Sequence, residues 1–135
     1  MSAPVQKAIY DKLKPLTYNP QNALSVDPYH YLATFTGEFT ADIAGTIDED
    51  IIAPPTDKAI TTYFTLLTTN SISGVVSLDF PDSGKVVNRL YASIVNRTTW
   101  GYAKVTGGAN EKLKLRGVNL DAGAKVFVIV LYTTG

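Results

Sequence analysis

Few residues in this sequence have the types and spacing that enzyme catalysis requires. The only histidine, His30, stands between Tyr29 and Tyr31, and a general base needs a nucleophile or a second titratable group within hydrogen-bond reach. Sequence spacing does not exclude a Ser-His-Asp arrangement of distant residues. A small enzyme built around His30 is therefore a hypothesis, ranked third after the two given at the end of this subsection. A Tyr-His-Tyr strand is more typical of a packed or stacked surface, and we predict no catalytic residues.

One acidic run has the residue types of a cation site. Asp48, Glu49 and Asp50 are consecutive, with Asp42 and Asp57 nearby in the sequence, and Ca²⁺ binds clusters of carboxylate oxygens. Consecutive residues of a strand point to opposite faces, so these side chains would not converge without a bulge. We interpret the run as a charged sheet edge that discourages aggregation, and we predict no metal and no cofactor.

A pair of aromatic residues indicates a different chemistry. Trp100 and Tyr102 are two residues apart, so on a strand they would share one face. Such a platform could stack on sugar rings, as in carbohydrate-binding modules. Large aromatic side chains are also commonly buried in cores and subunit interfaces, so both interpretations of this pair stay open.

The composition is that of a folded domain without net charge. The chain has 135 residues, of which 45% are hydrophobic and 18% charged, which fits one domain and argues against disorder. Twelve basic residues balance twelve acidic ones, which disfavours nucleic-acid binding because phosphate recognition needs clustered Lys and Arg. Residues 1–56 carry a net charge of −4 and residues 57–135 one of +4. The two halves could attract each other within a chain or between neighbouring copies, or they are simply two solvated surfaces.

The sequence has no features of a disulfide-bonded or membrane-inserted protein. Cysteine is absent, which excludes disulfides and thiolate metal sites. The first residues lack a basic region followed by an apolar core, and no apolar run approaches the ~20 residues of a membrane span. We expect a soluble protein made in the cytoplasm, without a membrane partner.

The last predicted strand is the most apolar part of the chain, with seven large apolar residues in a row. Side chains alternate along a strand, which gives one face of Val126, Val128, Val130 and Tyr132 and another of Phe127, Ile129 and Leu131. An antiparallel sheet normally exposes one face to water. The second apolar face therefore needs a cover, supplied either by the N-terminal region or by another subunit.

The N-terminal region is predicted to be a short helix followed by an extended arm. Apolar residues recur at helical spacing over residues 3–14, and Pro15 ends the pattern. Residues 15–28 contain three prolines among polar residues, which is typical of an extended connector. A strand is predicted over residues 29–35, with a turn at Gly37.

From residue 46 on, β-rich runs alternate with turn signals about every 10 residues, the spacing expected of a β-sandwich or barrel. The predicted strands are residues 46–53, 59–68, 74–80, 85–95, 100–106, 111–116 and 125–133. The predicted turns are residues 54–57, 69–71, 81–84, 96–98, 107–110 and 120–123. In the strand 74–80, Val76, Leu78 and Phe80 are predicted to point inward and Asp79 outward, whereas residues 85–95 have apolar side chains on both faces. We predict an all-β fold, an antiparallel β-sandwich of about seven or eight strands over residues 46–135, with residues 1–45 forming the helix and arm.

Several runs in the second half resemble small β-sandwich domains of tailed-bacteriophage virion proteins. They are residues 51–60 (IIAPPTDKAI), 73–78 (SGVVSL), 89–91 (RLY), 107–113 (GGANEKL) and 126–132 (VFVIVLY). The resemblance covers about residues 46–133. It implies a jelly-roll-like fold and a role as a capsid decoration protein, a head fibre or a tail appendage, frequently as a trimer.

The first hypothesis is therefore a non-enzymatic phage virion protein, a trimeric capsid decoration or head-fibre protein whose N-terminal arm binds the major capsid protein or another virion protein. The predicted partner-binding residues are Val5, Ile9, Leu13, Tyr18, Tyr29 and Tyr31. The predicted oligomer interface contains Tyr91, Phe127, Ile129 and Leu131. The second hypothesis is a carbohydrate- or receptor-binding module of a tail fibre that uses Trp100 and Tyr102. The oligomer number and the choice between capsid and tail attachment stay open.

Overall fold

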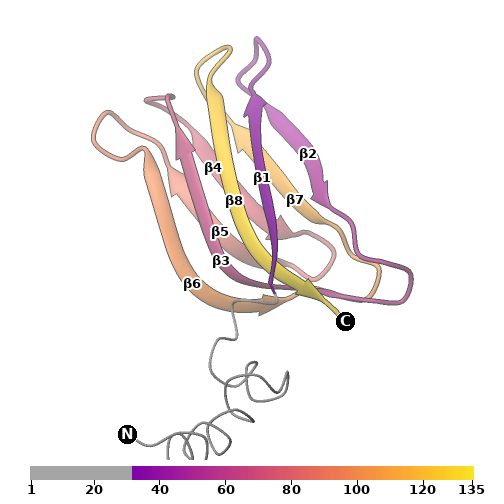
Figure 1. Ribbon diagram of the computed structural model, residues 1–135. Coiled ribbons are helices and arrows are strands. Elements are labelled where there is room, and N and C mark those ends of the chain that lie inside the picture. The colour runs from indigo at the N-terminus through magenta and orange to yellow at the C-terminus, as the bar shows by residue number, and fades with distance from the viewer. Residues whose placement is uncertain (1–31) are drawn as a thin grey trace, which may run out of the picture. The chain divides into compact units, whose positions relative to one another are not determined.

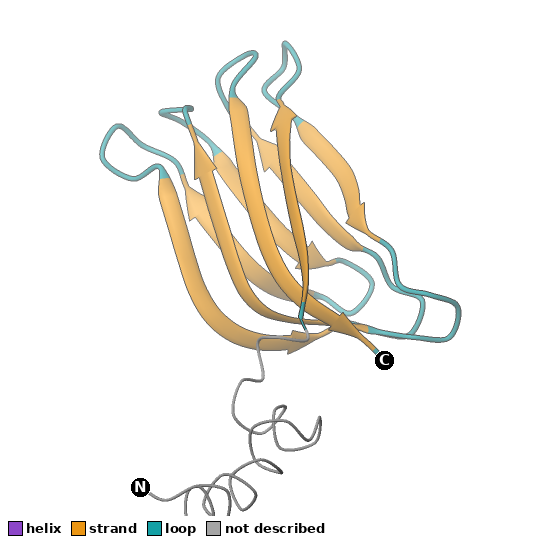
Figure 2. Cartoon of the chain, in the orientation of Figure 1, coloured by secondary structure: helices purple, strands orange, loops and turns teal. Residues whose placement is uncertain are grey.

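The computed structural model describes residues 32–135, which form eight strands (Figure 1). The strands are β1 (Ala33–Thr40), β2 (Ile47–Ile52), β3 (Ile60–Thr69), β4 (Val75–Phe80), β5 (Lys85–Tyr91), β6 (Thr98–Thr106), β7 (Leu113–Val118) and β8 (Lys125–Thr134). Figure 2 shows that loops and turns make all the connections between these strands. The helix predicted over residues 3–14 lies outside the described residues.

The eight strands form two antiparallel sheets that face each other. Sheet A has the order β1-β8-β3-β6 and sheet B the order β2-β7-β4-β5. Every connection crosses from one sheet to the other except the β4–β5 hairpin, so the chain weaves between the two layers (Figure 1). The prediction of an all-β fold with two antiparallel sheets is confirmed. Among the described residues, no helix is long and apolar enough to cross a membrane.

The hydrophobic core lies between the sheets and is built by alternation along the strands. On β8 the side chains of Val126, Val128 and Val130 are fully buried, and on β4 so are Val76, Leu78 and Phe80. These residues belong to one hydrophobic cluster that spans both sheets. The three residues of β4 were predicted to face inward, whereas the sequence left open which face of β8 meets the core. Each buried valine side chain stabilises the fold by roughly 1.5 kcal/mol or more through its removal from water.

The first strand differs from the prediction. Gly37 is not in a turn but lies in the middle of β1, opposite Val128 of β8. The rings of Phe35 and Phe39 stack across it with centroids 6.4 Å apart, and a Cβ at Gly37 would meet the Phe35 ring at 3.0 Å. The glycine thus makes room for two aromatic side chains. Since β1 pairs with β8 along its whole length, sheet A includes residues that we had assigned to the arm.

The connection between β5 and β6 also differs from the prediction. We expected a strand over residues 85–95 and a turn at residues 96–98, but β5 ends at Tyr91 and Thr98 already belongs to β6. Ser93 and Asn96 exchange backbone hydrogen bonds of 2.9 and 3.3 Å. The reversal is therefore a tight hairpin with Ile94 and Val95 at its tip.

The loops of the sandwich divide between its two ends. The connections β1–β2, β3–β4, β5–β6 and β7–β8 lie at one end, which we call the loop end (Figure 1). There Asp121 accepts hydrogen bonds from the Ile72 amide (2.9 Å) and the Ser73 hydroxyl (3.0 Å). The Ile72 amide, followed by the Ser73 hydroxyl, lowers the pKa of Asp121. The charged form of Asp121 thus ties the β7–β8 loop to the β3–β4 loop.

Candidate interaction surface

The apolar side chains on the second face of β8 lie on the outside of sheet A. Phe127, Ile129 and Leu131 alternate with the buried valines and are each half-buried. Their cross-strand neighbours on β3 are Leu66 opposite Ile129 and Phe64 opposite Leu131. The apolar surface therefore continues sideways from β8 onto β3.

The surface extends onto β6 through three aromatic rings. Phe64 lies opposite Tyr102, and Leu66 lies opposite Trp100. The Phe64 ring centroid is 5.0 Å from that of Tyr102 and 6.4 Å from that of Trp100. Trp100 and Tyr102 remain 62% and 67% exposed. We call this set the outer apolar face: Phe64, Leu66, Trp100, Tyr102, Phe127, Ile129 and Leu131.

The geometry of the aromatic pair affects what it can bind. The Trp100 and Tyr102 rings are 6.2 Å apart and meet edge to face at 88°. Edge-to-face contacts are typical of protein packing. The two rings do not share a plane, so they do not form one flat platform for consecutive sugar rings.

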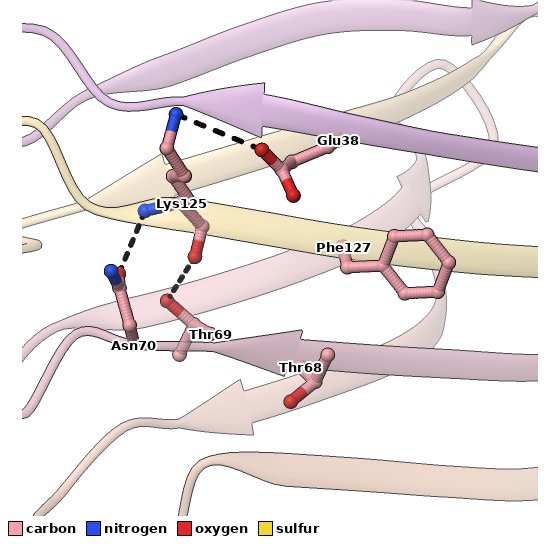
Figure 3. Close-up of a pocket in the computed structure, with 6 residues that line it drawn as sticks. All are labelled: Glu38, Thr68, Thr69, Asn70, Lys125 and Phe127. Carbon is pink, nitrogen blue, oxygen red and sulfur yellow. Dashed lines mark hydrogen bonds and ion pairs between the residues drawn. The ribbon is translucent and has the colours of Figure 1, made fainter.

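The outer apolar face ends in an open pocket near the loop end (Figure 3). The pocket has a volume of about 340 Å³, and Phe127 is its only large apolar side chain. Lys125 forms an ion pair with Glu38 at 3.7 Å. Its backbone amide donates to the Asn70 side chain (2.8 Å), and its carbonyl accepts from the Thr69 hydroxyl (2.8 Å). The pocket therefore combines a fixed backbone wall, an apolar floor and one carboxylate.

Sheet B has an outer surface of the opposite character. Lys114 pairs with Asp48 at 2.9 Å and with Asp50 at 3.7 Å, and Lys112 pairs with Asp50 at 3.6 Å. The hydrogen bond to Asp48 raises the pKa of Lys114. An outer surface with such a row of ion pairs is stable when exposed to solvent, because exposed pairs keep most of their hydration.

One ion pair of sheet B is partly buried. Asp79 on β4 is only 4% exposed and bonds to the Arg116 guanidinium from β7. That hydrogen bond, together with the charge of Asp79, raises the pKa of Arg116. Oδ1 of Asp79 has no hydrogen-bond partner among the described residues. We predicted that Asp79 would face water, but it is covered, and Arg116 is its ion-pair partner.

The predicted site residues do not all come together. Phe127, Ile129, Leu131, Trp100 and Tyr102 share the outer apolar face, which joins the predicted oligomer interface to the predicted stacking pair. Tyr91 lies apart from them, exposed at the end of β5 in sheet B. The predicted arm residues Val5, Ile9, Leu13, Tyr18, Tyr29 and Tyr31 lie outside the described residues, as does His30.

Several carboxylates in the described part of the chain form hydrogen bonds that shape loops. Over residues 32–135, no group of three or more His, Cys, Asp or Glu side chains could hold a metal ion. Asp42 accepts from the Ala44 and Thr46 amides at 2.9 Å each, which shapes the β1–β2 loop. Glu111 is buried, which by itself raises its pKa, but hydrogen bonds from Gly108 and Ser83 lower the pKa overall. These carboxylates fix loops.

Sequence reasoning missed two parts of the surface. Phe64 and Leu66 were included in a predicted strand but not assigned to a face, although the alternation with buried Thr65 and Leu67 carries that signal. The apolar hairpin tip was missed because the β-branched residues Ile94 and Val95 have high strand propensity.

The comparisons with known proteins agree with the fold. No protein-family model matches the sequence, and no curated protein matches it. A similar fold occurs in a solved structure described as "Acidic stable capsid structure of Helicobacter pylori bacteriophage KHP30", with a TM-score of 0.54 and 18% sequence identity. The match covers 74% of this chain and 86% of that chain. The resemblance to β-proteins of phage virions, first noted in the sequence, is therefore shown in the fold.

Proposed function

We propose that this protein is a structural component of a phage virion that assembles with copies of itself. The observation that carries the proposal is the contrast between the two outer surfaces of one sandwich. Sheet B presents a row of ion pairs, whereas sheet A presents the outer apolar face. Contiguous exposed apolar surface of this kind marks a protein interaction site.

The strand order supports the virion role. The orders β1-β8-β3-β6 and β2-β7-β4-β5 place the strands that are joined at the loop end at the same position in the facing sheets: β1 with β2, β3 with β4, β5 with β6 and β7 with β8. This pairing supports the proposal of an eight-stranded jelly roll, a fold common in viral capsid domains. The fold neighbour comes from a phage capsid structure. Since one fold can serve many functions, the proposal rests first on the outer apolar face and second on the fold.

The finer form of the proposal is a trimeric capsid decoration or head-fibre protein without enzymatic activity or cofactor. Its N-terminal arm would contact the major capsid protein or another virion protein, and sheet A would face neighbouring copies. The near balance of charge favours protein partners over nucleic acid.

Truncation of the arm tests this proposal. All strand pairs of the two sheets lie within residues 33–134, so a chain without residues 1–28 should keep the folded sandwich. We expect the truncated protein to lose binding to virus particles while its circular dichroism spectrum stays that of a β-protein. Retained particle binding after truncation would contradict the assigned role of the arm.

A second candidate function is glycan or receptor binding in a tail fibre. It is favoured by one observation, the exposure of the Trp100 ring on the outer apolar face, because an exposed indole can stack on a single sugar ring. Under this alternative, Trp100→Ala would abolish binding on a glycan array without changing the oligomer. An unchanged array profile would leave only the assembly role for this residue.

A further inference from the structure

The hairpin that joins β5 to β6 is held rigidly in place. The Asn96 side chain donates to the Tyr91 carbonyl (3.0 Å), and the Arg97 guanidinium donates twice to the Ile94 carbonyl (3.1 and 3.2 Å). At its base, the Arg97 carbonyl accepts from the Thr69 amide (2.9 Å). The polar groups of the hairpin thus fix its shape.

The tip of this hairpin is apolar where turn chemistry would favour polar residues. Ile94 and Val95 are 68% and 94% exposed. Exposed hairpin tips usually carry Gly, Asn, Asp or Ser. Neither tip residue has a positive φ. The backbone conformation of the tip therefore does not explain why it carries Ile94 and Val95. A rigid loop with two projecting β-branched side chains is a preorganised contact element.

The pocket at the end of the outer apolar face has properties that complement those of the hairpin tip. Its floor is the half-buried Phe127 ring, and Glu38 lines one side. Glu38 is exposed and paired only at 3.7 Å with Lys125, which leaves its oxygens able to accept further bonds. Arg97, two residues from Val95, uses Nε and one terminal nitrogen on the Ile94 carbonyl, and its other N–H groups remain able to donate. The apolar tip can therefore pack on the apolar floor, and Arg97 can share the Glu38 carboxylate with Lys125, which also lines the pocket.

We propose that the Ile94–Val95 hairpin tip of one copy inserts into the Phe127–Glu38 pocket of the next copy. This inference rests on the proposed self-assembly and deepens it, because it names the element that one subunit presents and the site that receives it. The contact joins two different surfaces of the same chain, so it is heterologous, and such contacts close into rings when the rotation between copies allows it. In a closed ring of three copies, every tip would occupy a pocket and every pocket would be filled.

A disulfide between copies tests the contact directly, because the natural chain contains no cysteine. The test variant carries Thr40→Cys beside the pocket and Val95→Cys at the tip. Thr40 is on β1 and the hairpin leads into β6, and these strands are the two edges of sheet A. Three strand spacings separate them, about 14 Å, so a bond within one chain is excluded because its Cα atoms must lie within about 7 Å.

We expect mild oxidation of the double-cysteine variant to give covalent oligomers on a non-reducing gel, with loss of most of the monomer band. Each single-cysteine variant is the control and should not form the ladder of oligomers. A variant with Ile72→Cys in place of Val95→Cys is a second control, since Ile72 is also exposed at the loop end and follows β3, two strand spacings from β1. Equal cross-linking from position 72, or none from position 95, would overturn the proposed contact.

A second measurement uses polar tips that suit a turn. The Ile94→Ser, Val95→Asn variant should keep the fold and raise the dissociation constant of the oligomer about thirty-fold or more in sedimentation, as for the loss of an interface hot spot. Ile43→Asn should leave the constant unchanged. An oligomer of unchanged affinity in the tip variant overturns the tip-in-pocket contact alone. A natural chain that is monomeric at all concentrations overturns self-assembly itself, and the two failures are thus distinguished.

Discussion

Alanine substitutions at neighbouring positions of β8 should separate the stability of the sandwich from its assembly. Val128 faces the core and is fully buried, whereas Ile129 faces outward and is half-buried. Val128→Ala removes two carbon atoms from the core, worth about 1.6 kcal/mol of transfer free energy, and the cavity raises the total to about 2–3 kcal/mol. Ile129→Ala removes three carbon atoms, but they are only partly buried in a single subunit and their loss leaves no closed cavity, so we expect a smaller cost of about 1–2 kcal/mol.

The assay is denaturant unfolding of both variants in dilute solution, combined with sedimentation across a range of protein concentrations. Val128→Ala should lower the free energy of unfolding and leave the association constant of the folded chains unchanged. Ile129→Ala should weaken association and have the smaller effect on unfolding in dilute solution, because oligomer formation adds stability that depends on concentration. The reasoning is refuted if Ile129→Ala costs as much as Val128→Ala in dilute solution while association stays unchanged.

Three further predictions concern single contacts. Gly107→Ala should lower the free energy of unfolding by about 1–3 kcal/mol, because the added Cβ would lie 2.5 Å from the buried Phe80 ring. Gly101→Ala is the control, since no atom lies within 4 Å of its added Cβ. Equal effects of the two substitutions in denaturant unfolding would contradict the packing explanation. Arg116→Ala should cost about 3 kcal/mol because it leaves the buried carboxylate of Asp79 unpaired, whereas Lys112→Ala, from an exposed pair, should cost less than about 0.5 kcal/mol; similar losses would show that Asp79 is hydrated. Asp121 has a pKa lowered in the folded state, so its charged form stabilises the fold above the unfolded pKa near 4 and this contribution disappears as the pH falls through the folded value. Asp121→Ala should therefore lower the melting temperature at pH 7 and match the natural protein near pH 2, and a difference that persists in acid would refute the linkage.

The fold was largely predictable because alternation on the long strands is clear. The two faces of β8 follow from its run of apolar residues, and buried Val128 and half-buried Ile129 lie where that pattern placed them. Turn signals also had a physical basis, since Asp57, Asn110 and Gly84 adopt positive φ in predicted turns. Local chemistry therefore determined most strand boundaries to within a few residues.

The differences arise where tertiary contacts override local signals. Gly37 has the residue type of a turn, but two phenylalanine rings use the space that it leaves within β1. Ile94 and Val95 have the residue types of a strand, but side-chain hydrogen bonds from Asn96 and Arg97 close a hairpin there. Both signals are local, whereas the partners that decide the outcome become visible only in three dimensions.

The outer apolar face could not be assembled from sequence for a related reason. Its members come from β3, β6 and β8, and strand order alone brings Phe64, Trp100 and Ile129 to one surface. The sequence identified the apolar face of β8 and the aromatic pair of β6 as separate features. Their union depends on β3 lying between them, which no local pattern encodes.

The different outer surfaces of the two sheets have a consequence for handling the protein in salt. Added sodium chloride weakens the solvent-exposed pairs of Lys114 with Asp48 and Asp50 on sheet B. Sulfate and phosphate instead strengthen the burial of apolar surface such as Ile129 and Leu66 on sheet A. Ammonium sulfate should therefore drive the copies together through sheet A, and low-salt buffers without such ions should favour the separated subunits.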